Sequence, residues 1–291
     1  MLDEMRRSYW EFIQTADGKD SNEICQAATR SLGSLEPTKE GIEGFAREIA
    51  REAGRYIEAA DVRFSKTGYF FSVAINRLEE KKDQEVVLDF REGIATYPPQ
   101  ESISRKMSGF GYKFPRGNLT VIGGDLFNFG GNQIAGTLLL IGDSSGYVNS
   151  GQIDGLTTVD GTCAGKAGYR KHGGTTRILK APTEKQIKSL AKGQTYMMEA
   201  GCEATGGLIE APECGDYAGL RNMGCIIRSS VMGIMVGHEM AAGDIQADRI
   251  EKKQLSDKIF GGRIFEKRNG VYVQVWPEGK NENRAYFRSA F

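Results

Sequence analysis

Two aspartates, Asp125 and Asp143, are the residues in this sequence whose type and spacing best suit catalysis. They occupy similar places in two successive 19-residue segments, so a fold that stacks these segments would bring the two carboxylates close together. Neighbouring carboxylates can hydrolyse a glycosidic bond, one as the general acid and the other as the base or nucleophile. Stacked acids can also bind a cation. The alternative is a solvated acidic surface that performs no chemistry.

The other reactive side chains give weaker patterns. The chain has only two histidines, His172 and His238, which are too few for a histidine-rich metal site, and we expect both to be solvated structural residues at turns. Cys214 precedes a glycine-rich stretch, but no base that could activate its thiol is apparent, so we expect it to be buried. We therefore predict no metal site, no cofactor of the chain's own and, apart from the aspartate pair, no catalytic residue.

Charge and hydropathy restrict the partners of the chain. Its 291 residues include 38 Lys and Arg against 38 Asp and Glu, so it lacks the basic surplus typical of nucleic-acid-binding proteins. Its apolar runs, such as TLLLIG at 137–142, are too short to cross a bilayer. The N-terminus lacks the apolar core of a signal peptide, and none of the five cysteines has CxxC spacing. We therefore expect a cytoplasmic protein with no nucleic-acid partner and no membrane insertion.

Glycine gives the strongest signal in the composition, with 38 residues, about twice the usual share. A series of glycines recurs with a constant 19-residue spacing, apart from one longer interval before Gly224, after which the register resumes. The series comprises Gly117, Gly136, Gly155, Gly174, Gly193, Gly224, Gly243 and Gly262. Nearly every member precedes a short segment rich in β-branched or large apolar residues. We interpret the series as the corner of a repeated coil, where the backbone needs the positive φ that glycine adopts most easily.

A strand that recurs at a fixed spacing is typical of a parallel β-helix, in which each strand lies against the strand of the previous coil. We predict a mainly β protein with a right-handed parallel β-helix of about seven coils over residues 98–267. An apolar ladder should line its interior, formed by the following residues or their immediate neighbours: Leu119, Leu139, Ile141, Val159, Ile178, Met197, Ile226 and Ile245.

The flanking regions have other patterns. The N-terminal residues have the periodicity of amphipathic helices, with Thr38 as the expected N-cap of one of them. The segments 69–78 and 85–90 have the composition of strands joined by a charged turn, so residues 1–97 are predicted to form a helical region with a short β hairpin. Residues 268–291 are predicted to form a C-terminal hairpin or cap, because Arg-Asn-Gly lies between two strand-like segments.

The segment GDYAGLRNMG at 215–224, followed by the strand-like CIIR, resembles a coil of the Gly-rich β-helix domain family. This family includes the C-terminal domain of the glutamate synthase large subunit and the β-helix subunit of formylmethanofuran dehydrogenase. The residues that match the family coil are Gly215, Asp216, Tyr217, Ala218, Gly219, Met223 and Gly224. The resemblance extends over about residues 117–243. It implies a scaffold that supports the flavin-, iron–sulfur- or molybdopterin-bearing parts of an oxidoreductase, and it implies no catalytic residue.

These observations favour a non-catalytic scaffold subunit of an oxidoreductase complex resembling glutamate synthase or formylmethanofuran dehydrogenase. Its expected partners are redox subunits or further copies of itself. Two alternatives remain open at this point. One is a stand-alone β-helix enzyme that acts on carbohydrate through Asp125 and Asp143. The other is a structural protein that self-assembles by stacking its end coils.

Overall fold

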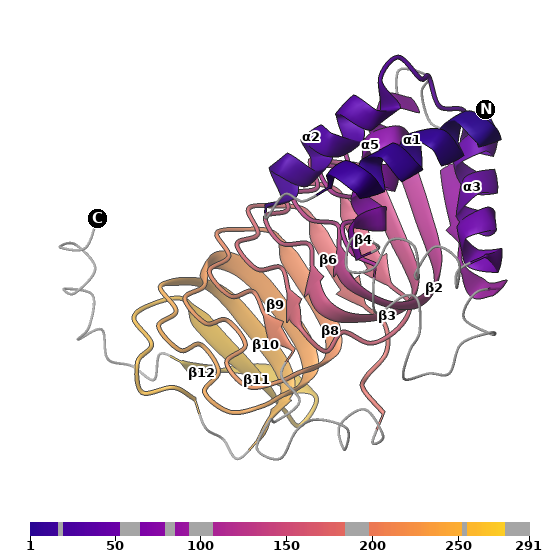
Figure 1. Ribbon diagram of the computed structural model, residues 1–291. Helices are drawn as coiled ribbons and strands as arrows, with labels where there is room; N and C mark the ends of the chain where they lie inside the picture. The colour runs from indigo at the N-terminus through magenta and orange to yellow at the C-terminus, as the bar shows by residue number, and fades with distance from the viewer. Residues whose placement is uncertain are drawn as a thin grey trace. The chain divides into compact units, whose positions relative to one another are not determined.

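The structure is a computed structural model that describes residues 1–16, 20–52, 65–78, 85–92, 107–183, 198–251 and 255–276, without the side chains of residues 124 and 125. The predicted fold class is confirmed, because the protein is mainly β, with a parallel β-solenoid of about 7 turns at 19-residue spacing, and its described residues include 4 helices (Figure 1). The chain divides into two compact units. The first contains Met1–Gly146 with Thr157–Asp160, and the second contains Tyr147–Leu156 with Gly161–Phe291.

The helices belong to the first unit and share an aromatic core. They are α1 (Leu2–Thr15), α2 (Ser21–Leu32), α3 (Lys39–Arg51) and α5 (Thr67–Leu78). The fully buried Tyr9 ring lies 5.3 Å from the rings of both Phe45 and Phe70, centroid to centroid, so it joins α1 to α3 and α5. The predicted N-cap is confirmed, because the Thr38 hydroxyl accepts a hydrogen bond from the Gly41 N–H at 3.1 Å.

Helix α5 corrects one prediction. The segment 69–78 was expected to be a strand because it is rich in aromatic and β-branched residues, yet it is helical throughout. Phe70, Phe71 and Ala74 are completely buried, so burial within the helical core outweighs the strand propensity of these residues. The predicted hairpin is therefore wrong. The second segment does form a strand, β1 (Glu85–Asp89), but it pairs in parallel with β2, from Glu85 opposite Asn118 to Asp89 opposite Ile122.

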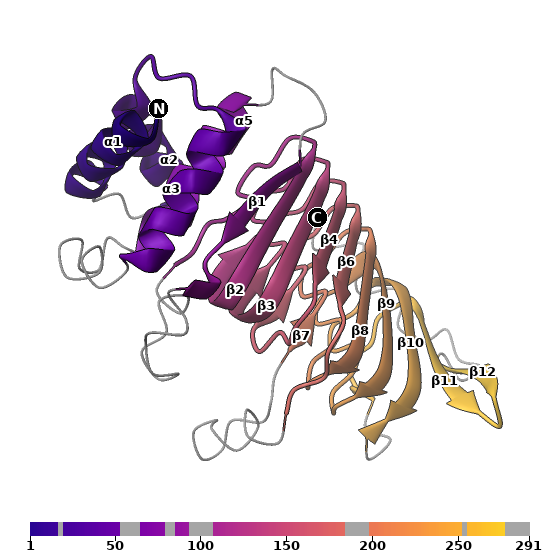
Figure 2. The same cartoon turned by 90° about the vertical axis from the view of Figure 1, so that its right-hand side faces the viewer.

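The remaining strands form the solenoid, and in the second unit also the terminal hairpin (Figure 2). They are β2 (Asn118–Phe129), β3 (Thr137–Val148), β4 (Leu156–Val159), β5 (Lys166–Ala167), β6 (Thr175–Ile178), β7 (Glu199–Ala200), β8 (Leu208–Cys214), β9 (Met223–Met232), β10 (Ala242–Ile250), β11 (Arg263–Arg268) and β12 (Val271–Trp276). Hydrogen-bonded neighbours follow the order β1-β2-β3-β4 in the first unit and β6-β8-β9-β10-β11-β12 in the second. Short strands β5 and β7 pair with each other on another side of the coils.

The interior of the second unit contains an isoleucine ladder. Ile209 pairs with Ile227, Ile227 with Ile245, and Ile245 with Ile264. All four side chains are completely buried, so each coil places an identical branched side chain on the previous one. The first two steps of this ladder are one residue shorter than the last, so the repeat is less regular than the glycine series indicated.

The predicted interior ladder is correct for Leu119, Val159, Ile178 and Ile245, which are buried. At the other described positions an immediate neighbour faces inward instead, which the prediction allowed. Leu138, Leu140 and Ile227 face inward, whereas Leu139 and Ile226 are half-buried and Ile141 is exposed. Because successive strand residues point to opposite faces, a shift of one residue reverses the assignment. Met197 lies outside the described residues.

Most of the predicted corner glycines have the left-handed backbone that the prediction assumed. Positive φ values, from 68° to 95°, are found at Gly117, Gly136, Gly155, Gly174, Gly243 and Gly262. Gly224 is a wrong assignment, because it lacks a positive φ. The corner of its coil is Cys225, which directly precedes Ile226, the residue paired with Leu208. Gly207, with φ 84°, occupies the corner of a coil that the 19-residue series did not include. Gly193 lies outside the described residues.

A buried polar side chain lies three residues before several corners and supports the backbone there. The Gln133 and Gln152 side-chain amides each donate hydrogen bonds to the carbonyls of the following corner, at 2.9 to 3.2 Å. Asn222 does the same to the Cys225 carbonyl at 2.8 Å. Lys171 occupies the equivalent position before Gly174 and is also completely buried. The three amide side chains thus give the corner carbonyls buried hydrogen-bond donors.

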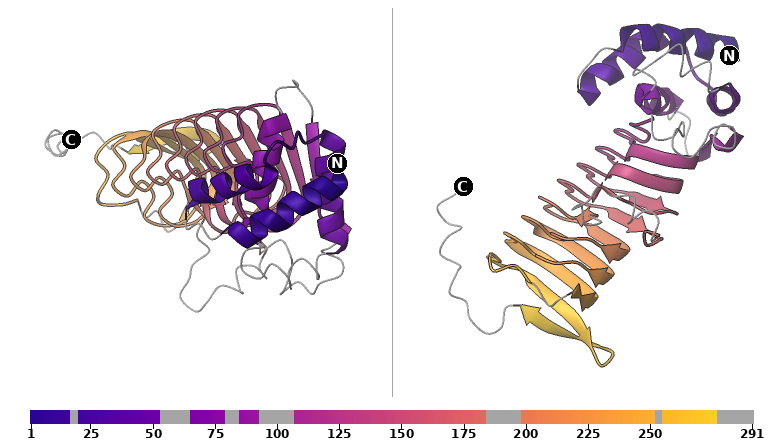
Figure 3. Two further views of the ribbon diagram at one scale, coloured as in Figure 1. Left: turned by 45° about the horizontal axis from the view of Figure 1, so that its top comes forward. Right: turned by 60° about the horizontal axis from the view of Figure 1, so that its bottom comes forward.

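A C-terminal hairpin is present, but it comprises β11 and β12 and begins at Arg263, before the predicted residues 268–291. Residues 277–291 lie outside the described part of the chain. Strands β11 and β12 pair antiparallel around Asn269 and Gly270, whose φ values are 52° and 82° (Figure 3), as expected for an Asn-Gly turn. In the part of the chain that the structure describes, no helix is long and apolar enough to cross a membrane.

Candidate functional site

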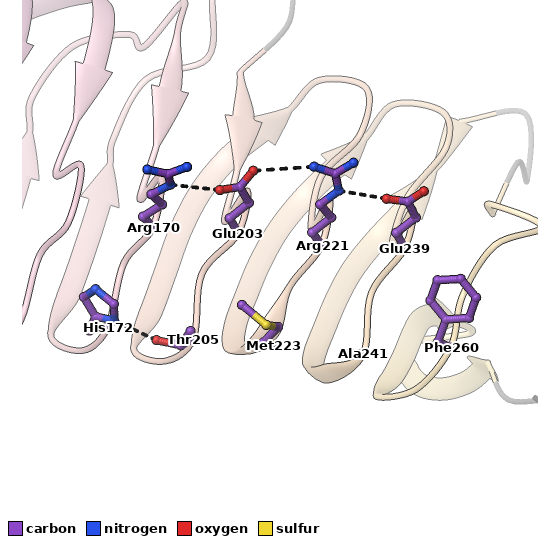
Figure 4. Close-up of a pocket in the computed structure, with 9 residues that line it drawn as sticks. All are labelled: Arg170, His172, Glu203, Thr205, Arg221, Met223, Glu239, Ala241 and Phe260. Carbon is purple, nitrogen blue, oxygen red and sulfur yellow. Dashed lines mark hydrogen bonds and ion pairs between the residues drawn. The ribbon is translucent and has the colours of Figure 1, made fainter. Parts of the chain in front are cut away.

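The candidate site is a surface groove in the second unit, with a volume of about 480 Å³. Four consecutive coils line it with two side chains each and the next coil adds Phe260, so the lining forms two parallel rows (Figure 4). The lining residues are Arg170, His172, Glu203, Thr205, Arg221, Met223, Glu239, Ala241 and Phe260. The repeat itself builds the groove, because the same two positions recur in coil after coil.

The first row alternates in charge. Arg170 Nε lies 2.9 Å from Glu203 Oε2, Arg221 Nη1 lies 3.7 Å from Glu203 Oε1, and Arg221 Nε lies 2.8 Å from Glu239 Oε2. All four residues have φ values between 51° and 55°. This left-handed turn, four residues before the corner, points each side chain outward at the same place. We call these four residues the ion-pair row.

The ion pairs change the titration of the acids. The hydrogen bond and charge of Arg221 lower the pKa of Glu239, and those of Arg170, with a smaller contribution from Arg221, lower the pKa of Glu203. The same interactions raise the pKa values of Arg170 and Arg221. The row therefore stays fully ionised and electrically neutral at physiological pH.

The second row lies two residues further along each coil and is largely apolar. It comprises His172, Thr205, Met223, Ala241 and Phe260, and we call it the apolar row. His172 Nδ1 and Thr205 Oγ1 are 2.9 Å apart and form a hydrogen bond at one end of the row. The other end is apolar, and the Met223 side chain is 40% exposed. An apolar strip beside a neutral charged strip is suited to contact with another molecule rather than to proton transfer.

The two predicted aspartates lie in neighbouring strands of the first unit. Asp143 lies in β3 and is half-buried. Asp125 lies in β2, but its side chain is outside the described part of the structure. The carboxylate pair therefore stays a prediction, and Asp143 does not line the groove.

His238 and the cysteines of the second unit have structural environments, whereas His172 lines the groove. His238 Nδ1 lies 2.8 Å from Ser256 Oγ, and its ring contacts Tyr217 edge-on. Cys214 is buried, as expected, and burial raises its pKa to about 12. Burial also raises the pKa of Cys202 to about 11 and that of Cys225 to about 12. Among the described residues, no group of three or more His, Cys, Asp or Glu side chains could hold a metal ion.

The family-like coil contributes to both the stacking and the groove. Asp216 Oδ1 accepts a hydrogen bond from the Ile234 N–H in the next coil at 2.9 Å. Ala218 is buried and Gly219 adopts a φ of 77°, so these residues serve the turn. Met223 is the one of the matching residues that lines the groove, beside Arg221 of the same coil.

The ion-pair row was not found from the sequence, although a signal for it exists. Glu203, Arg221 and Glu239 follow one another at a constant interval. The same interval separates the paired strand residues Leu208, Ile226 and Asp244. A search for alternating charges at the strand spacing would have found the row, but the 19-residue glycine series concealed the shorter coils.

Comparison of the chain with family models, with curated proteins and with solved structures gave no match.

Proposed function

We propose that this protein is a non-catalytic scaffold subunit that binds a protein partner along the groove of its β-solenoid. One observation carries the proposal: the apolar row, with Met223 exposed and Ala241 and Phe260 half-buried, runs beside a neutral row of ion pairs over successive coils. Protein interfaces have this composition, with apolar contacts at the centre and charged or polar groups at the rim. Met223 and Phe260 are the side chains best suited to anchor the partner.

The electrostatics of the groove support binding over catalysis. A general acid or base works best when its pKa lies near the operating pH. The Arg residues lower the pKa values of Glu203 and Glu239, away from neutrality. Burial raises the pKa of Cys202, the buried cysteine beside Glu203 in sequence, to about 11, which disfavours the reactive thiolate.

The partner that we propose is a redox subunit of an oxidoreductase. The support is the resemblance of residues 215–224 to a coil of the Gly-rich β-helix domain family, whose members support flavin, iron–sulfur or molybdopterin centres. In such an assembly the partner would carry the cofactor and this chain none of its own. We propose that the complex is cytoplasmic.

Purification of the tagged protein from its native host tests this function. We expect a partner subunit to co-purify, with visible absorption from a flavin, iron–sulfur or molybdopterin centre and with its identity given by mass spectrometry. Met223→Glu should release the partner, because it places a charge in the apolar row. Leu179→Glu is the matched control, since Leu179 is also exposed but does not line the groove. Recovery of the colourless chain alone, or equal retention of the partner by both variants, would contradict the proposal.

A further inference from the structure

Strand β12 is an exposed edge strand at the end of the sheet in the second unit. Among the described strands it pairs only with β11. Val271, Tyr272 and Val273 are 65%, 46% and 40% exposed. Successive strand residues point to opposite faces, so both faces of the hairpin tip are open. Figures 2 and 3 show the hairpin of β11 and β12 as the last element of the described chain.

The exposed part of the strand lacks charged residues and proline, two of the features that usually protect an edge. Its sequence, VYVQVW, contains no charged residue, proline or glycine. Natural edge strands commonly carry lysine, proline or a bulge, because the unpaired N–H and C=O groups otherwise pair with another strand. In β12 the N–H and C=O groups of the outer edge belong to a segment that has high β propensity and no charge. The register shifts from Ile264 opposite Trp276 to Phe265 opposite Gln274, so Val275 is the extra residue and the bulge lies near the C-terminal end of β12. The exposed residues Val271, Tyr272 and Val273 precede it.

The opposite situation is found at the edge strand of the first unit. Helix α3 packs against β1, and Glu43 Oε1 accepts a hydrogen bond from the Val87 N–H at 2.8 Å. A helix and a carboxylate therefore protect that edge. The difference indicates that the β12 edge is left open for a partner strand.

We infer that β12 pairs with β12 of a second copy of this chain, antiparallel across a two-fold axis. The absence of charge favours a second copy as the partner. A two-fold axis places each β12 strand opposite an identical strand, and an uncharged strand then meets no like charge. The Tyr272 hydroxyl donates a hydrogen bond to Asp248 Oδ1 at 2.7 Å, which orders the hairpin before pairing. Pairing joins the sheets of the two copies, so the outer N–H and C=O groups of both β12 strands become hydrogen-bonded.

This pairing is independent of the groove and of the proposed redox partner. The groove residues lie before the corners of the coils, whereas the pairing uses the outer edge of β12. The pairing also closes at two copies, because the same surface is used on both chains and the β1 edge is covered. The protein should therefore form dimers and not open filaments.

Light scattering coupled to size-exclusion chromatography of the full chain tests the inference over a dilution series. We expect wild type to have twice the mass of the chain and to dissociate on dilution. Val273→Lys should raise the dissociation constant by about tenfold or more, because a charge would then meet apolar residues across the axis. Val273→Thr, which keeps the strand propensity without a charge, should stay a dimer, as should Leu179→Lys, which places lysine at another exposed apolar position.

Three results would overturn the inference. One is a wild-type chain that is monomeric at every concentration. This result would be expected if the chain's own C-terminal residues, or a strand of another protein, paired with the β12 edge. Another is a dimer that Val273→Lys leaves unchanged, which would place the interface elsewhere. The third is an assembly that grows beyond two copies. Thermal unfolding of each variant checks that a loss of dimer is not a loss of folding.

Discussion

Arg221 Nε donates a hydrogen bond to Glu239 Oε2 at 2.8 Å, while its Nη1 lies 3.7 Å from Glu203 Oε1. One guanidinium therefore links three successive coils of the solenoid. The three residues occupy the same turn of their coils, with positive φ at each. The repeat of the backbone thus produces a repeat of charge, and the ion-pair row forms one wall of the groove.

Replacement of Arg221 by methionine should raise the pKa values of both acids. Arg221 is the main cause of the lowered pKa of Glu239, whereas Arg170 is the main cause for Glu203. We therefore expect a larger upward shift for Glu239 than for Glu203. Carboxyl titration by NMR would measure both values. A larger shift at Glu203, or none at either acid, would contradict the geometry of the row.

Arg177 provides the control for this experiment. It forms an ion pair with Glu210 at 2.7 Å on the outward face of the strands, and neither residue lines the groove. Arg177→Met should leave the titration of Glu239 unchanged. It should also leave partner binding unchanged.

Lys171 is completely buried in the solenoid, where its ammonium donates hydrogen bonds to Gln152 Oε1 and Thr176 Oγ1. Both acceptors are uncharged, and burial lowers its pKa to about 8. Lys171→Met should therefore stabilise the protein at pH 7, by roughly 1–3 kcal/mol, because a buried charge is replaced by an apolar side chain of similar size. Gln152 Oε1 would keep its hydrogen bond from Thr176 at 3.1 Å.

The gain from Lys171→Met should depend on pH with a definite sign. The folded lysine loses its proton near pH 8 and the unfolded lysine near its ordinary value of about 10.4. Between these values the unfolded chain binds more protons, so the lysine's unfavourable contribution decreases as the pH rises. The advantage of the variant should shrink over that interval. Urea unfolding of both proteins at several pH values would measure the difference.

The comparison between variants is needed because buried cysteines act with the opposite sign over the same interval. Their folded pKa values are raised, to about 12 for Cys214, so the stability they contribute is lost as the pH rises above the unfolded value. Lys267→Met, at an exposed lysine, is the control and should give no comparable gain. A destabilised Lys171→Met protein would show that the lysine is held by more than neutral acceptors.

Gly174→Ala should destabilise the corner more than Gly270→Ala destabilises the hairpin. Both glycines have positive φ, 68° and 82°. A Cβ at Gly174 would lie 2.5 Å from the Gly155 carbonyl oxygen, whereas a Cβ at Gly270 meets nothing within 4 Å. We expect about 1 kcal/mol from the backbone conformation alone at Gly270 and at least about 1 kcal/mol more at Gly174. Equal losses in chemical denaturation would mean that coil-to-coil contact at the corner is loose.

The sequence was sufficient for the fold class because the corner chemistry repeats. A residue such as Gly155, with a φ of 89°, must be glycine or incur a conformational penalty, so the register is visible without a structure. The register failed at Gly224 because its coil places Cys225 at the corner without a positive φ. Two coils are also one residue shorter than the others. These shorter coils, together with the coil that has a side chain at its corner, shift the glycines away from a series with a fixed spacing.

Burial explains the other errors. The residues of α5 have the composition of a strand, and only the contact of Phe70 and Phe71 with the aromatic core of the other helices makes them helical. The groove could not be predicted either, because its lining depends on which residues occupy equivalent positions in adjacent coils. Arg170 and Glu203 are far apart in the sequence but lie in adjacent coils, like Thr175 and Leu208.

Site-specific photo-crosslinking in the native host tests the central claim, that the groove binds a partner. A photoreactive residue would replace Met223 in one protein and Leu179 in another, both at exposed positions. We predict that the residue at position 223 forms a covalent adduct with a cofactor-bearing subunit and that the residue at position 179 does not. If the complex forms but position 223 gives no adduct, or position 179 gives the same adduct, the partner binds elsewhere and the claim is wrong.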